Sequence, residues 1–135
     1  MMNAKTFKDV ALLALRLIIA AVFINAGYAK LMFWGPLPEG MTMSANMVYL
    51  TQFLSIVEPL GGIALAVGFL TFWAAAGLAV IMVGASYFVY FVMQSAFFTG
   101  ATGTGLDYVL LLLAGCLVLM ACGSGNWSVD AKWKR

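Results

Sequence analysis

Residues 48–70, VYLTQFLSIVEPLGGIALAVGFL, are long and apolar enough to cross a lipid bilayer, and this stretch decides the fold. Glu58 lies near its middle, where a charged side chain costs roughly 2.5 to 3.5 kcal/mol on insertion scales unless a partner compensates it. Pro59 follows directly and predicts a kink, because proline cannot donate a backbone hydrogen bond to Ser55. The stretch is a predicted transmembrane helix with a buried acid. Glu58 is either a functional, proton-handling group or one half of a structural ion pair.

The rest of the chain has the same membrane character. Of its 135 residues, 64% are hydrophobic and 9% are charged, whereas an average soluble domain has about 25% charged residues. The length predicts a single domain over residues 1–135. The net charge of +2 gives no basic surface for nucleic acid. The sequence contains no histidine, which excludes bis-histidine haem and most zinc sites, so we expect no metal and no intrinsic cofactor.

Three further apolar segments accompany the central one. The four predicted helices cover residues 10–34, 48–70, 72–98 and 106–122. Proline and glycine mark loops after the first and third helices, whereas the second and third helices must form a hairpin with a tight turn. The sequence therefore predicts an all-α, four-helix transmembrane bundle.

Basic residues gather at the two ends of the chain, and the predicted loops at 35–47 and 99–105 contain none. The positive-inside rule predicts from this that both termini lie in the cytoplasm. We accordingly expect a multi-pass protein of the plasma or inner membrane.

Four charged residues fall within the predicted helices, two basic and two acidic. Their charges can therefore neutralise one another in two ion pairs. Helix geometry places Arg16 about 9 Å above the inner membrane boundary and Glu58 about 15 Å below the outer one. We therefore predict an Arg16–Glu58 contact as the polar centre. Lys30 and Asp107 both lie near the outer boundary and form a second, shallower predicted pair. For Asp107, a capping role at the start of its helix competes with this pairing.

Polar side chains on the second and third predicted helices indicate where a ligand can bind. Tyr87, Tyr90 and Gln94 lie on one arc of the third helix, and Thr51 shares a face of the second helix with Glu58. If these two faces meet, the five side chains line a cavity in the outer half of the bilayer. Tyrosines near a membrane boundary also serve as interface anchors, which is the competing interpretation.

The order of several short motifs resembles the DoxX family of small four-helix membrane proteins. The motifs are a first-helix arginine, the pattern G-x-x-K-L at 27–31, VEPLGGIALAVGFLT at 57–71 and the closing GSGNWSVD at 123–130. The resemblance covers nearly the whole chain and implies the same four-helix fold.

The resemblance also implies site residues. It places the family's helix-one arginine, helix-two glutamate and helix-four acid at Arg16, Glu58 and Asp107. Family members often have a histidine in or after the third helix. This chain has none, so no metal or haem function is carried over from relatives.

A link to quinone chemistry follows from the resemblance, because the family takes its name from a subunit of a quinone-reducing or quinol-oxidising complex. Our leading hypothesis is a quinone-linked component of a membrane oxidoreductase system. In it a soluble oxidoreductase supplies the electrons, while this chain binds quinone and moves protons at Glu58. One alternative is a binder or transporter of a small lipophilic molecule, for which we expect a homo-oligomer. The other is a non-catalytic membrane anchor.

Overall fold

The computed structural model describes residues 2–134, and all of its named elements are helical. The elements are α1 (Ala4–Lys30), the 3₁₀ turn η1 (Leu31–Trp34), α2 (Ala45–Val67), α3 (Thr71–Tyr87), the π-helical turn η2 (Phe88–Val92), α4 (Leu106–Cys122) and the short α5 (Val129–Trp133). Three helical stretches, α1 with η1, α2, and α3 with η2, are long and apolar enough to cross a membrane, and α4 is a shorter apolar helix of 17 residues. The all-α prediction is confirmed.

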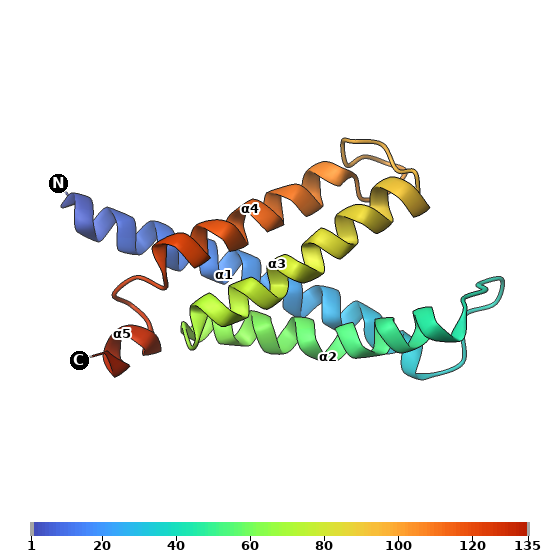
Figure 1. Cartoon of the computed structure of the whole chain (residues 1–135), viewed down its shortest axis with the longest axis horizontal. Helices are drawn as coiled ribbons and strands as arrows, with labels where there is room; N and C mark the ends of the chain where they lie inside the picture. The colour runs from blue at the N-terminus through green and yellow to red at the C-terminus, as the bar shows by residue number, and fades with distance from the viewer. Residues whose placement is uncertain (1, 135) are drawn as a thin grey trace.

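The four long helices associate as two pairs. α1 packs mainly against α2, and α3 packs mainly against α4. Figure 1 shows the two pairs meeting near the chain termini and diverging toward the opposite end, where residues 35–44 and 93–105 form loops. We call the end with the termini the closed end and the end with these loops the open end. The buried core, which includes Phe23, Leu65 and Leu119, lies where the pairs meet.

Helix boundaries follow local capping signals. α4 covers the predicted 106–122, whereas α2 begins and ends three residues earlier than predicted. Its first turn is capped by the Ser44 side chain, which accepts a hydrogen bond from the Met47 backbone. Gly68, with φ of 71°, ends the helix in the left-handed conformation, and the predicted tight turn to α3 follows.

The predicted third helix, 72–98, is too long. The regular α-helix ends at Tyr87, and the π-helical turn continues only to Val92. Beyond it the Ser95 amide donates to the Val89 carbonyl, and Gln94 adopts a left-handed backbone with φ of 48°. Gln94 therefore lies in a loop and does not extend the predicted helical stripe.

Arg16 joins three parts of the chain at the closed end. Its guanidinium is 1% exposed and donates to the Leu65 carbonyl at 2.8 Å and the Ala66 carbonyl at 2.9 Å. These carbonyls lie in the last turn of α2, so the cation complements the negative end of that helix dipole. The same side chain donates to the carbonyls of Ser124 and Trp127 in the segment after α4.

The predicted Arg16–Glu58 contact is therefore wrong. The prediction compared the depths of the two residues in the membrane and treated each helix as isolated. It did not include the carbonyl oxygens that the end of α2 and the segment after α4 offer to Arg16. Those oxygens satisfy Arg16 at the closed end, and Glu58 has a different partner, Lys30.

The tail also caps α3. The Asp130 carboxylate accepts hydrogen bonds from the amides of Leu70 at 2.8 Å and Thr71 at 2.9 Å, and the Asp130 amide donates to the Gly68 carbonyl. Partial burial raises the pKa of Asp130, but the hydrogen bonds from Thr71 and Leu70, together with the charge of Lys134, hold it below its usual range.

Asp130→Ala is expected to lower the free energy of unfolding by about 1 kcal/mol at neutral pH, because it removes the cap of α3. Since the folded-state pKa is lowered, this stabilisation is present above the unfolded-state pKa and is lost as the pH falls through the folded-state value. Melting curves in detergent at a series of pH values check both points. A difference between wild type and variant that stays constant down to about pH 3 would contradict the assignment.

Candidate functional site

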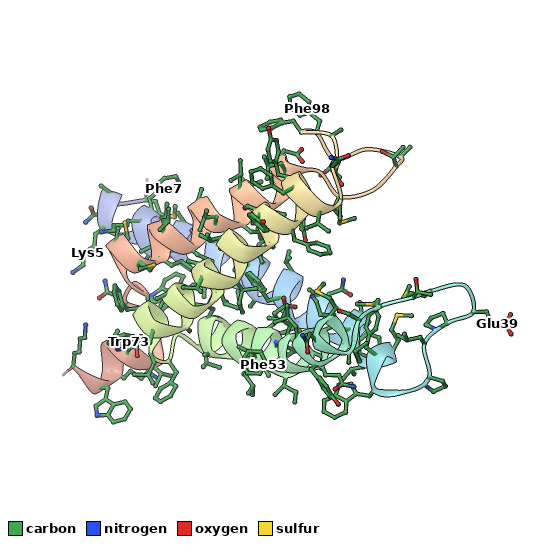
Figure 2. All side chains as sticks on the ribbon, turned by 45° about the vertical axis from the view of Figure 1, so that its right-hand side comes forward. Lys5, Phe7, Glu39, Phe53, Trp73 and Phe98 are labelled. Atoms are coloured by element: carbon green, nitrogen blue, oxygen red, sulfur yellow. The ribbon has the colours of Figure 1, made fainter. Side chains whose placement is uncertain are left out.

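A cleft of about 670 Å³ lies between the helix pairs and reaches toward the open end. All four long helices contribute to its walls, and the walls are mostly apolar. Phe53, labelled on α2 in Figure 2, is one of the lining side chains. The shape and polarity of the cleft are those of a site for a small lipophilic molecule.

One ion pair lies in the wall of this cleft. The Lys30 ammonium contacts the Glu58 carboxylate at 2.6 Å, and the same nitrogen donates to the Ala26 carbonyl at 3.4 Å. The Glu58 side chain is 4% exposed and the Lys30 side chain is 27% exposed. The carboxylate is therefore neutralised inside the protein, while its cationic partner remains partly open to the cleft.

Close packing of α1 on α2 brings this pair together. A Cβ atom on Gly27 would lie 2.1 Å from Cγ of Pro59, so only glycine fits against the proline ring. Gly62 makes a similar approach, since its Cβ would lie 3.0 Å from the Ala20 carbonyl. Small residues of this kind let membrane helices approach closely. Lys30 lies about one turn beyond Gly27 on α1, and this places its ammonium beside Glu58.

The end of α1 is held by a second set of contacts. The Trp34 indole donates to the Ser55 hydroxyl at 2.9 Å, and the Gln52 amide donates to the Phe33 carbonyl at 2.9 Å. These bonds fix η1 on α2 and thereby limit the movement of Lys30. Sequence reasoning did not find them. The available signal was the spacing of Gln52, Ser55 and Glu58, three residues apart on one helix face.

The structure brings some of the predicted site residues together and separates others. Lys30, Thr51, Glu58 and Tyr87 line the cleft. Tyr90 does not, and Gln94 lines a separate pocket of about 240 Å³ formed by the loop after η2. On the α4 side, two polar residues that sequence reasoning did not select also line the cleft, Thr104 and Tyr108. The binding role of each residue stays a prediction.

The predicted Lys30–Asp107 pair is also wrong. One carboxylate oxygen of Asp107 accepts from the amide and hydroxyl of Thr99 at 2.9 and 2.7 Å, and from the Tyr108 amide at 2.8 Å. The competing capping role is thus the one observed, because donors close in sequence surround the first turn of α4. Asp107 therefore stabilises the loop before α4, and Lys30 forms its ion pair with Glu58.

The chain has several apolar helices of spanning length, and they surround an apolar cleft with a charged pair in its wall. These features define it as a multi-pass integral membrane protein. It belongs to the DoxX family, whose model matches residues 11–91. The matched region includes Arg16, Lys30 and Glu58 and ends before α4. The chain is similar to the inner membrane protein YqjF of Escherichia coli (strain K12), with 26% identity over 126 residues, which cover 93% of this chain and 94% of that protein. No solved structure matches the chain.

Proposed function

We propose that this protein is a quinone-linked component of a membrane oxidoreductase system, and that its cleft holds the quinone ring beside Lys30 and Glu58. The observation that supports this most is the asymmetry of the ion pair. Glu58 is enclosed, whereas Lys30 is open toward an apolar cavity large enough for a flat ring. A purely structural clamp has no need for a cavity beside its charges.

The residues present fit such a ring. The Lys30 ammonium has three N–H donors, and Glu58 and Ala26 accept two of them, which leaves one for a ligand oxygen. Glu58 orients the Lys30 ammonium through their 2.6 Å contact, and it is the candidate proton-handling group of this proposal. The walls around this position are mostly apolar. When bound, the quinone supplies the redox chemistry itself.

The electrons in this proposal come from a soluble oxidoreductase that docks at the membrane surface. The sequence has no histidine for haem ligation, so a partner with its own electron carrier suits the chain. YqjF is an inner membrane protein, which supports an inner-membrane location for this chain as well, and the basic residues at both chain ends support cytoplasmic termini.

The second candidate is a binding or transport protein for a small lipophilic molecule, which uses the same cleft without an electron donor. The volume and apolar walls of the cleft favour this candidate equally. Co-purification of a soluble oxidoreductase, with electron flow to quinone that stops in Glu58→Gln, distinguishes the quinone-linked role from simple binding.

Glu58→Gln is expected to weaken quinone binding at least tenfold, on the order of 1.4 kcal/mol, because Lys30 loses its carboxylate partner and its orientation. The measurement is the saturable rise in melting temperature produced by a ubiquinone or menaquinone analogue in detergent. Glu39→Gln is the matched control, since Glu39 is an exposed acid in the loop at the open end (Figure 2). A wild-type protein without any saturable rise would instead favour the anchor hypothesis.

A further inference from the structure

We infer that the ligand enters the cleft sideways from the bilayer through an opening between α2 and α3, and that it carries an apolar tail which remains in this opening. The inference rests on the proposed function, because it takes the cleft beside Lys30 and Glu58 as the binding site. It adds the route of entry and the chemical class of the ligand.

Residues that line the cleft and are also exposed mark its opening. On α2 these are Leu50 and Phe53, which are 48% and 60% exposed. On α3 they are Val80 and Tyr87, which are 72% and 63% exposed. The rim between α2 and α3 is therefore open along about two turns of α3 and about one turn of α2.

The opposite wall is closed for much of its length. Phe23 on α1 is 1% exposed, and Val109 and Leu112 on α4 are 5% and 9% exposed, although all three line the cleft. Thr104 and Tyr108, the latter at 41%, are exposed lining residues at the open end of that wall. The main opening thus faces outward between α2 and α3, the two helices that Figure 1 shows diverging from their common turn.

The chemistry of the rim selects an apolar occupant. Leu50, Phe53 and Val80 present only hydrocarbon there, and Gly84 leaves a gap in the surface, since nothing lies within 4 Å of the position of a Cβ atom on it. The first charged groups that a ligand meets are Lys30 and Glu58 inside the cleft. The geometry fits a molecule with a small polar head and a long apolar tail.

Val80→Trp tests this inference, because the indole fills the rim without touching the ion pair. The two probes are a decyl-tailed ubiquinone analogue and the same ring without the tail, each titrated in nanodiscs of one lipid composition. The quantity compared is the factor by which the tail tightens binding. We expect Val80→Trp to reduce this factor at least about tenfold while binding of the tail-free ring stays within about twofold of wild type.

Val83→Trp is the matched control, since Val83 is 57% exposed on the same helix and does not line the cleft. Gly84→Phe is a second rim variant in case Val80→Trp fails to fold, and it should act like Val80→Trp. Equal tail factors in wild type, both rim variants and Val83→Trp would overturn the lateral route while the proposed function stands. A wild-type protein that binds neither probe would overturn the proposed function and the route with it.

Discussion

Arg16→Met is expected to lower the free energy of unfolding by more than about 3 kcal/mol, because each hydrogen bond to a charged donor contributes about 1.5–3 kcal/mol. The wild-type guanidinium donates to four backbone carbonyls, of Leu65, Ala66, Ser124 and Trp127. Methionine keeps an unbranched stem but is shorter and has no donor, so it removes the Arg16 hydrogen bonds to these oxygens at a buried site. Equilibrium unfolding in mixed micelles measures the loss.

Two further variants make this prediction specific. Arg16→Lys keeps the charge but has a compact ammonium in place of the guanidinium fork, so it should recover only part of the loss. Arg16→Met combined with Glu58→Gln should show additive losses within about 0.5 kcal/mol, since the two side chains do not touch. A larger coupling energy between them would contradict the arrangement of charges in this structure.

Gly27→Ala is expected to cost about 3 kcal/mol, the upper part of the usual range for overpacking, because the added methyl group meets a rigid ring. The new Cβ would lie 2.1 Å from Cγ and 2.3 Å from Cδ of Pro59. α1 and α2 must then separate, and Lys30 moves away from Glu58. We therefore expect both a lower melting temperature and weaker quinone binding.

Gly77→Ala is the matched control, because nothing lies within 4 Å of a Cβ atom at Gly77 on α3. In that position alanine should be neutral or slightly stabilising, since it favours helix over glycine by about 1 kcal/mol in a helix interior. Gly27→Ala combined with Pro59→Ala should recover much of the loss by removing the ring. Equal melting temperatures for Gly27→Ala and Gly77→Ala would show that the close approach of α1 to Pro59 does not matter.

The two ends of the molecule differ in which groups their charged side chains contact. At the closed end, Arg16 and Asp130 tie the tail to the turn between α2 and α3, and both bind backbone groups. Toward the open end the helix pairs diverge, and Lys30 and Glu58 are left in the wall of a cleft.

The sequence by itself determined the class of protein, the all-α fold, the tight turn between α2 and α3 and the family. These features depend on local properties: runs of apolar residues, the very short gap between the second and third runs, and motifs in a set order. The helix-three prediction shows the limit of this reasoning. Apolar residues continue past Val92, but the helical turn ends there, and Gln94 adopts a left-handed backbone in the loop that follows.

Only the tertiary structure decided which charged residues meet. Arg16 and Glu58 stood out in the sequence because an unpaired charge in a membrane is costly, yet that cost does not specify the partner. Close packing of Gly27 on Pro59 set Lys30 beside Glu58, and the tail folded back to offer carbonyls to Arg16. Such contacts depend on the crossing of helices and on residues more than a hundred positions apart, whereas a helical wheel records only the direction of one side chain on one helix.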